Sequence, residues 1–281
     1  MDLQPIIVKY YEKLSKSNKL VADYFLGNWE AIAFSTLEEV ANHIGVSTTT
    51  VIRFARAIGF QGYSTLQQML QNNIRNKVGL PQRLDISMER GQKAQLFTNS
   101  FKNDITNLYK TLETLQVESV ALAVSMIIAA RNVYLLGARA CFSIAHYMAV
   151  RLGQVRENVR LIQGIGGIYP EEIIAMGQDD VCIAYLLPRY SRIAMNTLQW
   201  AKKSEAKIIV ITGPSPKNFE THADVVLPCW TRGVTIKNSL VVPICLSQYL
   251  VAEVMMSDYA RSKIVLSKIE DVLQKGNYFV L

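Results

Sequence analysis

The chain has 281 residues, of which half are hydrophobic, and this is enough for a buried core in one or two domains. Its formal net charge of +7 is compatible with a polyanionic partner. The cysteines Cys141, Cys182, Cys229 and Cys245 are too far apart for a zinc site of the CxxC kind, so we expect reduced core thiols and no metal or other cofactor.

No segment predicts export or membrane insertion. The first eleven residues contain Pro5 and charged side chains in place of an apolar core. The most apolar later run, residues 240–256, is interrupted by Pro243 and Glu253 and is shorter than the roughly 20 residues that a membrane helix needs. We therefore expect a cytoplasmic protein with no membrane partner.

Residues 1–30 predict two helices with a break at Ser17-Asn18. Each helix has an apolar stripe, and we expect the stripes to buttress the segment that follows in a small bundle. The aromatic side chains here indicate a core rather than a ligand site. They are Tyr10, Tyr11, Phe25 and Trp29.

Residues 35–62 predict two short helices joined by a glycine turn. The first helix has apolar residues at helical spacing and stops at Gly45, a residue that adopts positive φ readily. Ser47 is a natural N-cap for the second helix, which ends at Gly59. The outer face of the second helix offers hydroxyls and guanidinium groups that can bond phosphates or base edges. This face contains Thr48, Thr49, Thr50, Arg53 and Arg56.

Two interpretations of this hairpin are open, namely a helix-turn-helix that binds DNA and a helical hairpin used only for packing. DNA binding is favoured because the inner and outer faces both fit and no carboxylate lies between Thr48 and Gly62.

The run from Ala41 to Tyr63 resembles the helix-turn-helix domain of bacterial RpiR-family transcription regulators. It follows the pattern A-x-x-x-GVS-x-x-TV-x-RF-x-R-x-x-GF-x-GY. The resemblance implies that the second helix enters the major groove of a double-stranded operator, and that the protein is associated with the nucleoid when bound there. The expected DNA-binding residues are Ser47, Thr48, Thr49, Thr50, Arg53, Arg56 and Tyr63.

The helical spacing of apolar residues ends at about residue 77. Residues 78–95 have mixed charge and no sustained periodicity, so we expect a linker between a helix-turn-helix domain at 1–77 and a second domain at 96–281. The apolar pattern resumes as a long amphipathic helix. Its apolar residues are Leu96, Phe97, Phe101, Ile105, Leu108 and Leu112.

Strands and helices then alternate, which indicates an α/β three-layer domain with a parallel sheet covered on both faces. The expected strands are 132–136, 159–163, 180–187, 207–212 and 223–227. The expected helices are 120–130, 143–152, 171–176, 191–203 and the stretch from 236 to near the C-terminus. The fold class is thus an all-α helix-turn-helix bundle followed by an α/β domain of flavodoxin type.

Two strand-to-helix junctions, 136–141 and 187–191, each contain an arginine in a tight loop. Because ligands bind beyond the carboxyl ends of parallel strands, where helix N-termini attract anions, we expect a phosphate site there. Simple connecting turns with solvated arginines are the alternative. The GIGGI stretch, 164–168, has the wrong spacing for a dinucleotide fingerprint.

Residues 115–260 resemble the SIS (sugar isomerase) domain, which binds sugar phosphates in RpiR-family regulators. The matching pieces include YLLGARACFSIAHYMAVRLG and DDVCIAYLLPRYSR. The family's hydroxyl ligands are mostly replaced: Cys141 and Leu186 stand at serine positions, and only Ser191 is kept. The resemblance implies that Lys237 begins a helix close to the ligand. The expected effector-binding residues are Gly137, Arg139, Cys141, Arg189, Tyr190, Ser191 and Lys237.

Three functions follow from these patterns. The favoured one is a transcription regulator of sugar or amino-sugar metabolism, controlled by a phosphorylated sugar and assembled as a homodimer or homotetramer. In the second, the SIS domain only oligomerises or binds a non-standard ligand. The least favoured is a sugar-phosphate isomerase, because His43, His146, His222, Glu171 and Glu172 offer no convincing general base, so we expect no enzyme activity.

Overall fold

The computed structural model describes residues 3–33, 35–67, 69–70, 95–164, 170–214 and 221–276, with the single residues 81, 84, 219 and 278. The chain forms two compact units, Met1–Ile86 and Ser87–Leu281. Only residues 81, 84 and 95 of the expected linker are described, so the limits 1–77, 78–95 and 96–281 stay predictions. The GIGGI stretch likewise lies outside the described residues except for Gly164.

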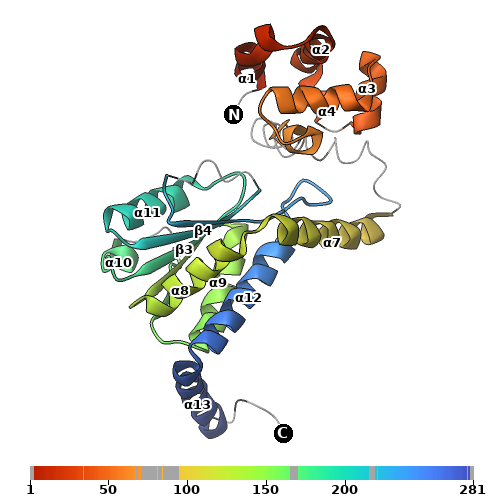
Figure 1. The fold of residues 1–281 in the computed structure, drawn as a ribbon. Helices are drawn as coiled ribbons and strands as arrows, with labels where there is room; N and C mark the ends of the chain where they lie inside the picture. Colours follow the sequence, from red (N-terminus) through yellow and green to blue (C-terminus); the bar gives the residue numbers. More distant parts are fainter. Residues whose placement is uncertain are drawn as a thin grey trace. The chain divides into compact units, whose positions relative to one another are not determined.

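The first unit is helical (Figure 1). It contains α1 (Leu3–Tyr10), a 3-10 turn (Tyr11–Lys13), α2 (Lys16–Ile32), α3 (Leu37–Ile44) and α4 (Thr48–Ala57). The rings of Phe25 and Phe54 are fully buried with centroids 5.1 Å apart, so α2 and α4 share one core. The chain breaks before Ser15 rather than at Ser17-Asn18, because the Ser15 hydroxyl accepts the Asn18 N–H and caps α2.

The second unit is built on a five-stranded parallel sheet in the order β2-β1-β3-β4-β5. The strands are β1 (Val133–Gly137), β2 (Val159–Leu161), β3 (Val181–Leu186), β4 (Lys207–Thr212) and β5 (Val225–Pro228). The helices are α7 (Leu96–Thr114), α8 (Val117–Ala129), α9 (Ala140–Gly153), α10 (Pro170–Ile173), α11 (Arg192–Lys203), α12 (Val241–Ser257) and α13 (Tyr259–Lys275). Helices α8, α9 and α12 cover one face of the sheet, and α10 and α11 lie on the other, so the expected three layers are confirmed (Figure 1).

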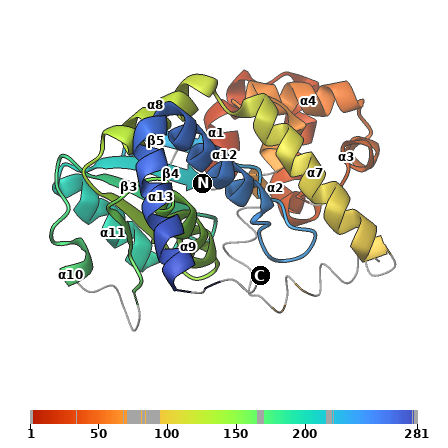
Figure 2. The ribbon, with the colours of Figure 1, turned by 90° about the horizontal axis from the view of Figure 1, so that it is seen from below.

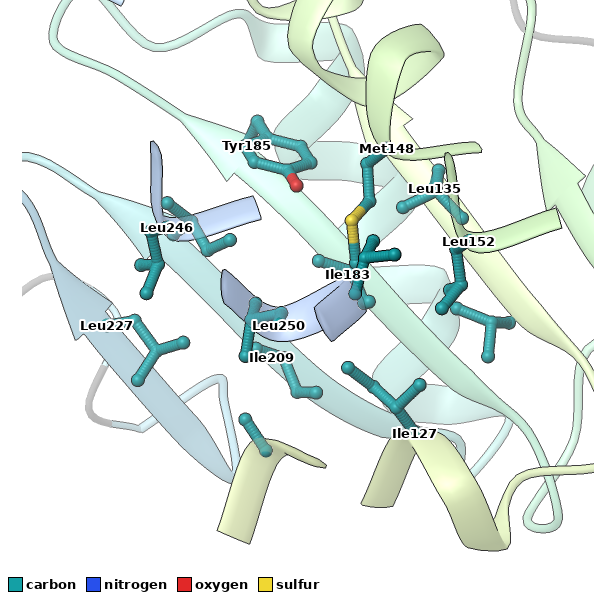
Figure 3. Close-up of a cluster of buried hydrophobic side chains, with 14 of the residues drawn as sticks. Ile127, Leu135, Met148, Leu152, Ile183, Tyr185, Ile209, Leu227, Leu246 and Leu250 are labelled. Carbon is teal, nitrogen blue, oxygen red and sulfur yellow. The ribbon is translucent and has the colours of Figure 1, made fainter. Parts of the chain in front are cut away.

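Each face of the sheet has its own apolar core. Figure 3 shows Leu135, Ile183 and Ile209 from three strands packed against Met148 of α9 and Leu250 of α12. The alternate residues of the same strands pack toward α11. Both central strands, β1 and β3, are therefore buried along their whole length, as parallel strands between helical layers are.

Three cysteines are buried as expected, but Cys245 is exposed on α12. All four thiols are free. The prediction of a buried thiol was wrong at Cys245 because the surrounding run is apolar on every side, so the sequence does not reveal which side of α12 faces the sheet.

The C-terminal helix begins later than expected. Residues 236–240 form part of the connection between β5 and α12, and α12 starts at Val241. Lys237 therefore lies in a loop and begins no helix. Asn238 and Ser239 hold this loop by hydrogen bonds, from Asn238 Nδ2 to the Pro188 carbonyl (2.9 Å) and from the Ser239 N–H to the Thr231 carbonyl (3.1 Å).

Helix α7 exposes the apolar stripe that its sequence pattern predicts. Phe97, Phe101 and Leu112 are 79%, 61% and 78% exposed, whereas Asn107 and Thr111 on the opposite side are buried. Helix α7 lies beside α12 (Figure 2). Among the described helices, none alone is long and apolar enough to cross a membrane; two bent pairs, α7 with α8 and α12 with α13, pass that test only when taken together.

The amino-terminal edge of the sheet is held by one carboxylate. Asp180 is fully buried and accepts hydrogen bonds from the Arg131 guanidinium (2.8 Å), the Asn132 backbone (3.1 Å) and side chain (2.8 Å), and the Gly177 N–H (2.9 Å). Burial alone would raise the pKa of Asp180, but these donors outweigh burial and lower the pKa to about 2.

We expect Asp180→Asn to lower the free energy of unfolding by about 3 kcal/mol at pH 7, because the N–H groups of Asn132 and Gly177 lose their charged acceptor. The folded pKa of Asp180 lies below the unfolded value of about 3.9, so this stability is present above pH 4 and is lost as the pH falls toward 2. Urea unfolding at pH 7 and pH 3 measures both effects. The exposed neighbour Asp179→Asn is the control, and equal losses in the two variants would contradict the anchoring role.

Candidate functional site

Helices α3 and α4 form the hairpin expected for a helix-turn-helix. A capping box starts α3: the Thr36 N–H donates to Glu39 Oε2 (2.7 Å) and the Glu39 N–H to the Thr36 hydroxyl (3.2 Å). Gly45 ends α3 with φ 75°, and the Val46 N–H turns back to the Ala41 carbonyl (3.0 Å). The turn between the helices is therefore set by local contacts.

The Ser47 hydroxyl caps α4 by accepting the Thr50 N–H (3.2 Å), and it shares a second bond with the Thr50 hydroxyl (2.9 Å). Val51 and Phe54 are fully buried on the inner side of α4. This packing fixes which side of α4 faces outward.

The outward side contains most of the expected DNA-binding residues. Ser47, Thr49, Arg53 and Arg56 are exposed, and Thr48 and Thr50 are half-buried. Thr49, Arg53 and Arg56 follow the i, i+4, i+7 spacing of one helix face. Arg56 also donates from Nε to the Gln61 carbonyl (3.2 Å), which orients its guanidinium along the end of α4.

Tyr63 does not belong to this surface. It is only 6% exposed, and its hydroxyl donates to the carbonyls of Ser35 (3.0 Å) and Ile32 (3.3 Å). Burial raises the pKa of Tyr63. The expectation that it contacts DNA was wrong, because its hydroxyl is bonded to the backbone at the end of α2 and its side chain is buried.

The two arginine loops of the second unit are neighbours. Strands β1 and β3 pair side by side as far as Gly137 and Tyr185, and the strand order reverses direction between them. A Cβ on Gly137 would lie 3.0 Å from the Ala145 Cβ and closer still to the Cys141 carbonyl, so only glycine lets α9 approach β1 here. The carboxyl ends of β1 and β3 thus form the topological switch point at which α/β folds bind ligands.

The first loop leads from β1 into α9. Arg139 is exposed, has φ 57°, and occupies the N-cap position of α9 without a side-chain cap. Cys141 is buried beneath it. Burial raises the pKa of the Cys141 thiol, and a backbone hydrogen bond with Leu187 of the other loop partly opposes this rise. Cys141 and Leu187 belong to the same buried cluster, so the two loops share one core.

The second loop leads from β3 into α11. Arg189 is exposed with φ 38°, and the half-buried Tyr190 stands edge-on to the Phe219 ring at 5.1 Å. Ser191 occupies the N-cap position of α11, but its side chain makes no capping bond. Neither N-cap side chain therefore caps its helix. At α9, the N–H groups of Cys141 and Phe142 donate to the backbone carbonyls of Ala138 (3.2 Å) and Arg139 (3.1 Å).

A third cation comes from the β5–α12 connection. Lys237 is exposed and adjoins Asn238, whose side chain is bonded to the second loop at Pro188. Within the part of the chain that the structure describes, no ion pair joins Arg139, Arg189 or Lys237 to a carboxylate. Positive charge therefore gathers at this edge of the sheet, beside the N-termini of two helices.

Two features of this edge, one hydrogen bond and the orientation of one side chain, were not evident from the sequence. The Thr212 hydroxyl at the end of β4 donates to the Leu186 carbonyl (2.6 Å), and Leu186 itself is buried in the core on the α11 side. The side chain of residue 186 thus faces the core. No local pattern indicates the Thr212–Leu186 bond, because the two residues are 26 positions apart.

The described structure places two of the side chains that were considered as general bases. Glu172 accepts the N–H groups of Gln163 (2.7 Å) and Gly164 (3.3 Å), and His146 is an exposed residue of α9. Among the described residues there is no group of three or more histidine, cysteine or carboxylate side chains able to hold a metal ion.

Comparison with known proteins matches two family models in succession. Residues 1–77 match the helix-turn-helix domain of the rpiR family, and residues 126–251 match the SIS domain. An uncharacterised HTH-type transcriptional regulator of Haemophilus influenzae is 26% identical over 225 residues, which are 77% of this chain and 76% of that protein.

Two solved structures share the fold. The sugar isomerase domain of an RpiR transcription factor from Sphaerobacter thermophilus has a TM-score of 0.60 and 26% identity, covering 63% of this chain and 99% of that one. The Vibrio vulnificus NanR protein complexed with ManNAc-6P has a TM-score of 0.60 and 19% identity, covering 96% of this chain and 98% of that one. The chain therefore combines an N-terminal helix-turn-helix domain of the rpiR family with a C-terminal SIS domain, and relatives that it matches are named as HTH-type transcriptional regulators.

Proposed function

We propose that this regulator controls genes of sugar or amino-sugar metabolism and that a phosphorylated sugar, bound at the carboxyl edge of the SIS sheet, sets its affinity for DNA. The observation that carries the proposal is the meeting, at one switch point, of two helix N-termini without side-chain caps and three cations that form no ion pair with any described residue. This arrangement favours a dianionic group.

The DNA-binding surface is the outward side of α4. Arg53 and Arg56 lie on it with Thr49, and Ser47, Thr48 and Thr50 sit at its N-terminal end. In helix-turn-helix proteins the N-terminal residues of the second helix approach base edges, and hydroxyls and arginines bond phosphates. The buried inner face makes α4 a rigid support for these side chains.

The phosphate is held by backbone and arginine rather than by side-chain hydroxyls. Cys141 is a weak donor, so the positive ends of the α9 and α11 dipoles carry the binding together with Arg139 and Arg189. Gly137 lets these elements approach closely, and Tyr190, Ser191 and Lys237 line the same edge. Strained backbone at both arginines is typical of ligand-binding loops. The related NanR structure holds ManNAc-6P, a ligand of the proposed class.

A second function, in which the SIS domain serves assembly, has its own support. The exposed stripe on α7 contains large apolar side chains, and exposed apolar patches mark interaction sites. We propose that this stripe contributes to a homodimer or homotetramer, which also gives a DNA-binding protein two recognition helices. Assembly and effector binding are compatible, and the experiments below separate them.

We expect Arg53→Ala to weaken operator binding about 5- to 150-fold if the arginine reads a base, since such a contact is worth about 1–3 kcal/mol. If it contacts phosphate, the slope of log K against log[salt] falls by about one instead. Fluorescence anisotropy over a salt series measures both. Lys13→Ala, which removes a charge from another exposed position of the same unit, is the control. If the native protein, Arg53→Ala and Lys13→Ala bind DNA with equal affinity and equal salt dependence, Arg53 does not contact DNA.

We expect a sugar phosphate at a hundredfold excess over its Kd to raise the melting temperature by about 5–10 °C, since this excess adds about 2.7 kcal/mol to stability. A thermal-shift screen of sugar phosphates, free sugars, polyols and small anions tests this. The Arg139→Ala and Arg189→Ala variants should lose the shift, whereas Arg151→Ala, at the far end of α9, should keep it. A flat screen with the native protein would contradict the effector and favour the assembly role.

We expect Phe101→Asp to shift the protein toward monomer, because a charge placed in an apolar contact is strongly unfavourable. Phe101 is 61% exposed, so the change should leave each folded unit intact. Light scattering after gel filtration measures the mass. Ile174→Asp, at a position 68% exposed beside α10, is the matched control. An unchanged mass in Phe101→Asp would place the interface elsewhere.

A further inference from the structure

Helix α7 is joined to its domain partly through polar contacts. Asn103 and Asn107 donate from Nδ2 to the Arg232 carbonyl (2.5 and 2.8 Å), and the Thr111 hydroxyl accepts the Trp230 N–H (2.9 Å). These three side chains are spaced four residues apart and form one face of α7, which we name the polar clasp. Lys110 adds a cation–π contact, with Nζ 4.5 Å from the Trp230 ring centre.

All of these bonds end on one short stretch, residues 229–240, which connects β5 to α12. The stretch is folded tightly on itself: a Cβ on Gly233 would collide with the Lys237 carbonyl, and the Ser239 N–H bonds the Thr231 carbonyl (3.1 Å). Its start is tied to β4, because the Cys229 N–H donates to the Thr212 carbonyl (2.7 Å). We name this stretch the connector.

The other end of the connector reaches the proposed effector edge. Asn238 donates to the Pro188 carbonyl (2.9 Å), beside Arg189, and Lys237 precedes it. Gly213, at the end of β4, allows Pro188 to lie close, since a Cβ there would be 3.1 Å from Pro188 Cδ. One compact stretch therefore touches both the arginine loop of α11 and the polar clasp of α7.

We propose that the connector transmits the state of the effector edge to α7, with Asn238 as the contact at the ligand side and the polar clasp as the contact at the helix. The inference builds on the proposed effector site. Helix α7 is the first element after the predicted linker along the chain, so a shift of α7 is the event through which the second unit can influence the first.

The chemistry of the clasp suits this role. Asn107 and Thr111 are buried, so a clasp bond that breaks must be replaced by another, and the clasp therefore favours discrete arrangements of α7 over a gradual displacement. Coupling then needs two arrangements of the clasp whose populations differ when the loop at Pro188 moves. Because coupling is reciprocal, a substitution in the clasp must also alter the local stability of the loop.

The first arm of the test changes the clasp and measures the loop, by hydrogen–deuterium exchange on the full chain without ligand or DNA. Thr111→Val should speed amide exchange of residues 189–192 about fivefold or more, the lower end of typical coupling. Thr106→Val is a matched control: its hydroxyl bonds the carbonyl four residues earlier, as Thr111 does, but it makes no bond to the connector. Indistinguishable exchange in the two variants at 189–192 would overturn the proposal.

The second arm works in the opposite direction. Asn238→Ala, a change at a half-buried surface position, should speed amide exchange in residues 104–112 of α7 by a similar factor. A change confined to residues 187–192 would overturn the proposal. Neither arm contains a sugar phosphate, so a flat thermal-shift screen would reject the effector without touching this result, and uncoupled exchange would reject the connector even if a sugar phosphate binds.

Discussion

Strands β1 and β3 pair in parallel from Val133 opposite Val181 to Gly137 opposite Tyr185, and both are buried on their two faces. The position of the proposed effector site depends on this pairing. It places the loops containing Arg139 and Arg189 next to each other, directs α9 and α11 to opposite sides of the sheet, and brings two helix N-termini to one edge. At the other edge, Asp180 holds the beginnings of the same two strands through Arg131 and Asn132.

The proposed phosphate site differs in its chemistry from a hydroxyl-lined pocket. Arginine and backbone N–H groups bind an anion mainly by charge and by the helix dipole. Such a site discriminates weakly among phosphorylated compounds, so the sugar must be selected by other side chains at the edge. The connector, with Lys237 and Asn238 beside the second loop, is the described segment best placed to do this. A single segment would then both recognise the ligand and transmit its presence.

The periodicity of the sequence predicted the helices and strands, but it did not predict which residues their side chains contact. The helix-turn-helix could be predicted in detail because its determinants are local: the Thr36–Glu39 box, Gly45 at φ 75° and the Ser47 cap all lie within twelve residues. Tyr63 was misassigned because its partners, Ile32 and Ser35, are about 30 positions away. Cys245 was misassigned because α12 is apolar on every side.

The sequence by itself determined the two folded units, the hairpin that presents α4, the alternation of strands and helices, and the positions of both arginine loops, since each follows from spacing and from residues that favour caps or positive φ. Only the tertiary structure decided which residues meet. The strand order brings the two loops together, the fold of residues 229–240 turns Asn238 toward Pro188, and the packing of α7 buries its polar side and exposes Phe97 and Phe101. These contacts join residues far apart along the chain, and no local pattern encodes such distances.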